Sequence, residues 1–129
     1  MNPAARRRNA ILHGVELFRA TAPATNLTGI LIFLYVCENP GVSVQSLADL
    51  LGLSAATASR SARALLAHGA DGALPPYADL LVLVGDVADR RGREFYLSSR
   101  GVQLRGRLNE AIERAVQIDE SSQGPIARL

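Results

Sequence analysis

The chain has 129 residues, of which 48% are hydrophobic, and this is enough for one packed core, so we expect a single domain over residues 1–129. Its 14 basic residues, all of them arginine, nearly balance its 12 acidic residues, and the formal net charge of +2 excludes a uniformly polybasic surface. Any affinity for nucleic acid must therefore come from local patches, while the single cysteine excludes an internal disulfide framework and a cysteine-based zinc site.

The N-terminal segment carries Arg6, Arg7 and Arg8 but no long apolar run followed by a cleavage site, so no signal peptide is expected. The three arginines fit a solvated arm better than a contact with phosphate. The apolar run at residues 27–36 is shorter than the roughly 20 residues that span a bilayer. These features predict a cytoplasmic location and no membrane partner.

Two helices are predicted before residue 40. The first covers residues 9–22, where Pro23 ends a stripe of apolar side chains at helical spacing, namely Ile11, Leu12, Val15, Phe18 and Ala22. The second, capped by Asn26, is apolar on nearly every side as far as Glu38, which predicts a central buried helix. Cys37 lies at its end, and packing fits this thiol better than a redox role, which requires an exposed thiolate beside a positive charge.

Residues 43–69 predict two helices joined by a tight turn. Ser43 can cap the first helix, Gly52 can end it in the left-handed conformation, and Ser54 can cap the second helix directly afterwards. One face of the second helix is apolar at helical spacing, through Ala58, Ala62, Leu65 and Leu66. The other face is small, polar and basic, and it consists of Ser54, Ala55, Ala56, Thr57, Ser59, Arg60 and Arg63.

A helix face of this kind suits the major groove of DNA, which admits a helix only if the leading side chains are short or can hydrogen-bond to base edges and phosphates. The alternative for these two helices is a pair of packed core helices with a solvated arginine face. The helix pair by itself leaves both interpretations open.

Residues 70–79 contain glycine, aspartate and paired prolines, and they predict a loop. Two β-rich runs follow at residues 80–84 and 94–97, so residues 80–98 predict a β-hairpin, which we call the wing. Its turn carries three arginines that can reach the backbone or the minor groove of a duplex, and two aspartates that can hold those arginines in position. The arginines are Arg90, Arg91 and Arg93, and the aspartates are Asp86 and Asp89. The alternative is a solvated turn whose charges neutralise each other.

A last helix is predicted at residues 100–118, capped by Ser98 or Ser99, and residues 119–129 predict a flexible tail. The apolar stripe of this helix can pack on the chain's own core, or it can join the stripe of the first helix in a two-fold dimer interface. We favour the dimer because two half-sites about 34 Å apart on DNA require two recognition helices. The predicted interface residues are Ile11, Val15, Phe18, Leu104, Leu108, Ile112 and Val116.

An enzyme is not expected from this sequence. His13 and His68 lie on different predicted helices with no motif around either, and the chain has no nucleophile elbow, phosphate-cradling glycine loop or paired metal ligands. We therefore predict no catalytic residue, no metal and no cofactor.

Residues 27–108 resemble the multiple-antibiotic-resistance regulator (MarR) family of winged-helix transcription factors. The run LTGILIFLYVCENPGVSVQSLADLLGLSAATASRSARALLAHG has the order and spacing of that family's helix-turn-helix, and DVADRRGREFYLSSRG is similar to its wing and the start of the next helix. The loop at residues 70–79 is longer than in the family, and the C-terminal region is shorter. By motif, the recognition helix is matched at Thr57, Ser59 and Arg60, and the wing signature at Asp89, Arg90 and Arg91.

The resemblance implies a mainly α fold with a small β-hairpin, a winged helix-turn-helix with N- and C-terminal dimerisation helices. It implies a homodimer that binds a pseudo-palindromic operator in double-stranded DNA, usually as a repressor, and that is often released by a small-molecule effector. Some members respond to thiol oxidation instead, but their cysteine lies in the first helix, so this property is not carried over to Cys37. The predicted function is sequence-specific transcriptional regulation, and the alternative is a winged-helix protein–protein interaction module without direct DNA readout.

Overall fold

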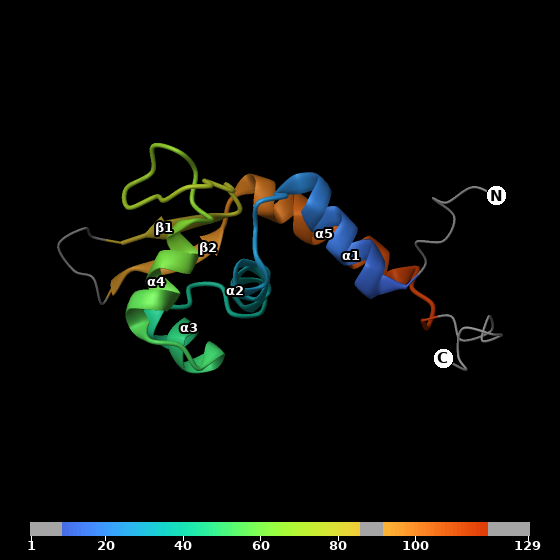
Figure 1. Cartoon of the computed structure of the whole chain (residues 1–129), viewed down its shortest axis with the longest axis horizontal. Coiled ribbons are helices and arrows are strands. Elements are labelled where there is room, and N and C mark those ends of the chain that lie inside the picture. Colours follow the sequence, from blue (N-terminus) through green and yellow to red (C-terminus); the bar gives the residue numbers. More distant parts are fainter. Residues whose placement is uncertain (1–8, 86–91, 119–129) are drawn as a thin grey trace, which may run out of the picture.

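The structure, a computed structural model, describes residues 9–85 and 92–118. The N-terminal arginines, the wing residues 86–91 and residues 119–129 lie outside the described residues. Within the described part, five helices and two strands follow one another along the chain (Figure 1). They are α1 (Ala10–Thr21), α2 (Leu27–Glu38), α3 (Val44–Leu51), α4 (Ala55–Arg63), β1 (Leu81–Val84), β2 (Glu94–Leu97) and α5 (Ser99–Glu113).

Each helix begins at a residue whose side chain caps it. The caps are Asn9, Asn26, Ser43, Ser54 and Ser98, and each side-chain oxygen accepts a hydrogen bond from the backbone N–H three residues later. Such a bond satisfies one of the amide groups that the first turn of a helix leaves unpaired. The predicted caps of α2, α3, α4 and α5 are thereby confirmed, with Ser98 rather than Ser99 at the start of α5. The turn after α3 is also as predicted, since Gly52 adopts the left-handed conformation with φ of 68°.

Helix α4 ends at Arg63 and is therefore shorter than its apolar pattern predicts. The carbonyl oxygen of Ala64 accepts from the N–H of Ala78 over 3.0 Å, and that of Leu65 accepts from Leu80 over 2.8 Å. N–H groups of a segment more than ten residues further along the chain thus bond the two carbonyl groups that a longer helix would bond internally. Leu66 then pairs with Leu81 in an isolated parallel bridge.

The two strands form an antiparallel sheet in which Leu81 lies opposite Leu97 and Val84 opposite Glu94. A third segment extends this sheet, because Val42, just before α3, forms an antiparallel bridge with Phe95. The base of the wing is therefore bonded directly to the turn that leads into the helix-turn-helix.

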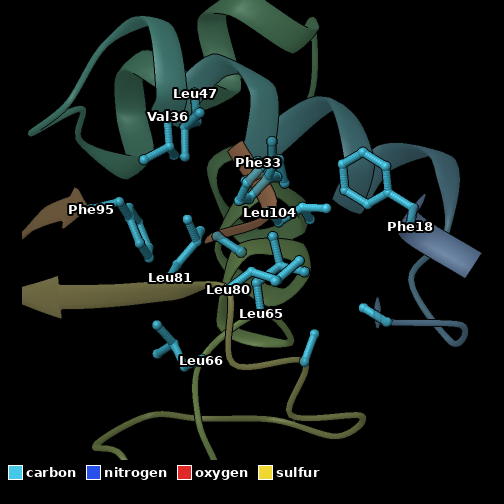
Figure 2. Close-up of a cluster of buried hydrophobic side chains, with 14 residues drawn as sticks. Phe18, Phe33, Val36, Leu47, Leu65, Leu66, Leu80, Leu81, Phe95 and Leu104 are labelled. Atoms are coloured by element: carbon cyan, nitrogen blue, oxygen red, sulfur yellow. The ribbon is translucent and has the colours of Figure 1, made fainter. Parts of the chain in front are cut away.

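The hydrophobic core lies where α2 meets the sheet, α4 and the start of α5. Phe33 of α2 is fully buried, together with Phe95 of β2 and Leu104 of α5 (Figure 2). At the edge of this core the ring of Phe18 packs edge-on against Phe33, with ring centroids 5.5 Å apart. The prediction that α2 lies at the centre of the core is confirmed for the side that carries Ile32, Phe33 and Val36. On its other side Leu27, Leu31 and Leu34 are exposed, so α2 is not buried all round as its apolar sequence predicts.

Helices α1 and α5 pack against each other and extend away from the body that holds the other elements (Figure 1). We call this helix pair the arm. Of the seven apolar residues predicted at a dimer interface, Phe18 and Leu104 lie in the chain's own core and Leu108 packs against it. The other four, Ile11, Val15, Ile112 and Val116, are exposed. Helix α5 ends at Glu113, five residues before the predicted end at Ile118, so Val116 lies beyond the helix.

Candidate nucleic-acid interface

The exposed face of α4 begins with three polar residues that are joined by hydrogen bonds. The Ser54 hydroxyl accepts from the Thr57 N–H over 3.1 Å and donates to the Thr57 hydroxyl over 3.0 Å. The Thr57 hydroxyl also accepts from Arg60 Nη2 over 3.4 Å. Because residues three apart share one face of a helix, these side chains form a row along α4.

The two faces of α4 differ as the sequence predicts. Ala58 and Ala62 are fully buried against the core. On the opposite side, Ala55, Ala56 and Arg60 are exposed, and Thr57 and Ser59 are partly exposed. Because the side chains next to Arg60 are short, a large molecule can approach the backbone of this helix closely.

The charges on α4 favour an anionic partner. The first turn contains no acidic residue, so no side chain of that turn opposes the partial positive charge at the helix N-terminus. A phosphate group is stabilised at such a terminus by the helix dipole and by backbone N–H groups. Arg60 adds a full positive charge one turn further along the same face.

Arg63, the last residue of α4, faces the loop that follows the helix-turn-helix. Its Nε donates to the carbonyl oxygen of Gly72 over 2.8 Å, and its own carbonyl oxygen accepts from the N–H of Leu74 over 3.0 Å. Arg63 therefore bonds the loop at residues 70–79, in addition to its place on the predicted basic face. The sequence shows Gly72 only as a turn former and contains no signal for this contact.

Arg93 lies at the base of the wing, directly before β2, and not at its tip. Its Nη2 atom donates to Asp71 Oδ2 over 3.0 Å, and its side chain is 19% exposed whereas that of Asp71 is 63% exposed. The loop at residues 70–79 therefore holds a second predicted DNA-binding arginine. Asp86, Asp89, Arg90 and Arg91, the other predicted wing residues, lie outside the described residues.

The second strand of the wing begins with an acidic residue, Glu94. The Tyr96 hydroxyl donates to Glu94 Oε2 over 3.1 Å. This hydrogen bond, together with the negative charge of Glu94, raises the pKa of Tyr96 because both favour the protonated phenol. Tyr96 is therefore a neutral hydrogen-bonding group at physiological pH and adds no charge to the wing.

Other kinds of site find little support in the described ranges. No group of three or more histidine, cysteine, aspartate or glutamate residues in residues 9–85 and 92–118 could hold a metal ion. None of the described helices is long and apolar enough to cross a membrane. A shallow pocket of about 500 Å³ lies beside α3, lined by residues 39–42 with Ser46, Asp49 and Leu50.

Comparison with solved structures shows that the fold is shared. RV1404 from Mycobacterium tuberculosis has a TM-score of 0.60 and 15% sequence identity, over 92% of this chain and 77% of that chain. The transcriptional regulator Tm0710 from Thermotoga maritima has a TM-score of 0.62 and 17% identity, over 92% of this chain and 75% of that chain. Likeness at this level of identity shows the fold alone, and it confirms the predicted winged-helix fold. The sequence matches no protein-family model and no curated protein.

Proposed function

We propose that this chain is a sequence-specific DNA-binding transcriptional regulator that places α4 in the major groove. The observation that carries the proposal is the row of Ser54, Thr57 and Arg60 on the exposed face of a helix whose other face is buried. The shared fold with a solved transcriptional regulator supports it. No catalytic role is proposed, and a cytoplasmic location fits the single cysteine of the chain.

The side chains on the exposed face of α4 differ in the DNA groups that they can contact. Arg60 can donate two hydrogen bonds to O6 and N7 of a guanine, and the hydroxyls of Thr57 and Ser59 can reach base edges or phosphates. The methyl groups of Ala55 and Ala56 can pack against the methyl groups of thymines. Arg63 and Arg93 remain part of the proposed surface, although both also hold the loop.

The wing is proposed to contact the backbone or minor groove beside the site of α4. Arg90 and Arg91 supply the positive charge in this proposal, and Asp86 and Asp89 hold them in position. These contacts would contribute affinity and register more than sequence preference, because phosphate contacts carry no direct base information.

We further propose a homodimer on a pseudo-palindromic operator, acting as a repressor. Its interface would use the exposed apolar side chains of the arm, Ile11, Val15, Ile112 and Val116. Phe18, Leu104 and Leu108 would support this interface from the core, since they fix how α1 and α5 pack together. A two-fold axis through the arm would give two copies of α4, one for each half-site. Any small-molecule effector would act on this dimer.

The competing proposal is a protein-interaction module whose α4 face docks a partner protein. Arg60→Ala and Arg91→Ala separate the two proposals, with Arg107→Ala, an exposed arginine of α5, as the matched control. We expect each of the first two variants to weaken binding to duplex DNA, and each lost phosphate contact to reduce the slope of log affinity against log salt by about one. Arg107→Ala should bind as the unmodified chain does. Equal DNA binding by all three variants would favour the interaction module.

A further inference from the structure

The start of α5 is bonded to three successive carbonyl groups of the segment that enters β1. The Ala78 carbonyl oxygen accepts from Arg100 Nη1 over 2.5 Å, and the Asp79 carbonyl oxygen accepts from the Ser98 hydroxyl over 2.8 Å. The third, that of Leu80, accepts from the Ser98 N–H over 3.0 Å. The arm is therefore attached to this segment, residues 78–81, which we call the connector.

The connector is bonded on its other side to the end of the recognition helix. Its N–H groups at Ala78, Leu80 and Leu81 donate to the carbonyl oxygens of Ala64 and Leu65, over 3.0, 2.8 and 3.1 Å. Both acceptors directly follow α4. The connector thus lies between α4 and α5. Its backbone N–H groups bond the residues that follow α4, and its carbonyl groups bond the start of α5.

Arg100 adds α1 to this junction. Its Nη2 atom donates to the carbonyl oxygen of Thr21, the last residue of α1, while Nη1 bonds the connector. The first turn of α5 is an unfavourable place for a positive charge, whereas the last turn of α1 is a favourable one. The guanidinium is therefore stabilised by α1 and the connector, and it joins both arm helices to the segment that holds α4.

The conformation of the connector also depends on these bonds. Asp79 within the connector and Tyr77 directly before it have positive φ angles, 56° and 54°, which are uncommon for residues other than glycine. The spacing to α5 is tight as well, since a Cβ added to Gly101 would lie 2.2 Å from the Leu80 carbonyl oxygen. A shift of either side of the junction would break hydrogen bonds of the connector.

We propose that Arg100 is a positioning residue that fixes the angle between the arm and α4 through the connector. In a dimer held together by its arms, this angle sets the distance between the two recognition helices and hence the half-site spacing that the protein accepts. The effect on half-site spacing rests on the proposed dimeric DNA-binding function, whereas the effect on the angle between the arm and α4 concerns the single chain.

The first experiment needs no DNA. Spin labels are attached to Ala56→Cys on α4 and Asn109→Cys on α5 in a Cys37→Ala background, both at exposed positions. An excess of unlabelled chain ensures that only distances within one chain are measured by pulsed electron resonance. We expect one narrow distance distribution with Arg100 present and a broad or displaced one in Arg100→Ala. Arg107→Ala is the control and should keep the narrow distribution.

Two further variants distinguish positioning from general destabilisation. Arg100→Gln keeps much of the side-chain stem and is used if Arg100→Ala does not fold, as judged by circular dichroism. Arg100→Lys restores the charge but lacks the planar fork that bonds two carbonyl groups in different directions, so we expect an intermediate distribution. An unchanged distribution in folded Arg100→Gln and Arg100→Ala would overturn the proposal.

The second experiment tests the consequence for DNA. Duplexes selected by the unmodified chain from a random pool are altered by one base pair in half-site spacing, and their affinities are compared. We expect the preference for the selected spacing to fall at least about tenfold in Arg100→Gln, because this variant loses at least one of the two charged hydrogen bonds and one such bond corresponds to about a tenfold effect. A residue needed only for folding would weaken binding to all spacings equally, which would overturn this role. If the unmodified chain prefers no duplex, the proposed function fails, while the distance measurement still decides the role of Arg100.

Discussion

Asp71 and Arg93 form an ion pair of 3.0 Å that ties the loop after the helix-turn-helix to the base of the wing. Close to it in the chain, Gly72 accepts a hydrogen bond from Arg63 of α4. The same loop therefore bonds one arginine of α4 and one arginine at the base of the wing. Because Asp71 neutralises Arg93 beside the proposed DNA surface, its charge opposes the approach of a phosphate.

Asp71→Asn should therefore strengthen DNA binding. Removing the negative charge leaves Arg93 available to a phosphate, so we expect affinity to rise about threefold to tenfold and the salt slope to steepen by about one. Stability should change by less than about 1 kcal/mol, because Asp71 is largely exposed. Fluorescence anisotropy at several salt concentrations measures the affinity. Glu113→Gln, the same charge change at the end of α5, is the control, and equal gains in both variants would contradict a local role for Asp71.

Two glycines of α5 should respond to alanine in opposite ways. A Cβ at Gly101 would meet the Leu80 carbonyl oxygen at 2.2 Å, so Gly101→Ala should lower the free energy of unfolding by about 3 kcal/mol, the upper end of the usual range for overpacking. Gly106 has no described atom within 4 Å of an added Cβ, and Gly106→Ala should raise it by about 0.5–1 kcal/mol through helix propensity. Denaturant unfolding measures both. Similar effects at the two positions would show that α5 does not pack on Leu80 as described.

Helix starts were predictable because capping is local chemistry. Asn26, Ser43, Ser54 and Ser98 each precede a helical pattern, and each bonds an amide only three residues away. The helical apolar pattern also located the buried face of α4, whereas α2 is apolar on nearly every side and its pattern did not show that Leu27, Leu31 and Leu34 are exposed. The exposed face of α4 followed from the same periodicity.

The end of α4 was not predictable from local pattern. Leu65 and Leu66 continue the helical spacing and are buried as that pattern requires, but the backbone leaves the helix at Arg63 because the connector bonds Ala64 and Leu65. The roles of Asp71 and Arg100 also depend on partners far along the chain. Asp71 bonds Arg93, 22 residues away, and Arg100 bonds Thr21, 79 residues away. Composition predicts a loop at residues 70–79, but only the tertiary structure shows that this loop bonds Arg63 and Arg93.

Ile112→Glu should abolish the proposed dimer. The Ile112 side chain is 63% exposed in the single chain, and a charge buried at an apolar interface would raise the dissociation constant by at least about a hundredfold. Val102→Glu, at an exposed position near the start of α5 outside the predicted interface, is the control. Sedimentation analysis at micromolar concentration should find a dimer for the unmodified chain and a monomer for Ile112→Glu. A monomeric unmodified chain would exclude binding to two half-sites.

Stability should fall at alkaline pH because of Cys37. Burial raises the pKa of the Cys37 thiol, while the charge of Arg105 partly opposes this shift. The folded chain then keeps the thiol proton at a pH where the unfolded chain has lost it, so stability is complete below the unfolded-state pKa of about 8.5 and decreases as pH rises through the folded-state pKa. Unfolding curves from pH 7 to 10 should show a smaller decrease for Cys37→Ala. Equal decreases in the two chains would mean that the thiol is not buried.

Selection of bound fragments from a pool of random duplex DNA tests sequence-specific binding most directly. We expect enrichment of a palindromic consensus with half-site centres about one helical turn apart, and loss of that enrichment in Arg60→Ala. Recovery of fragments without a shared sequence, or equal enrichment by Arg60→Ala, would contradict readout of DNA by the exposed face of α4.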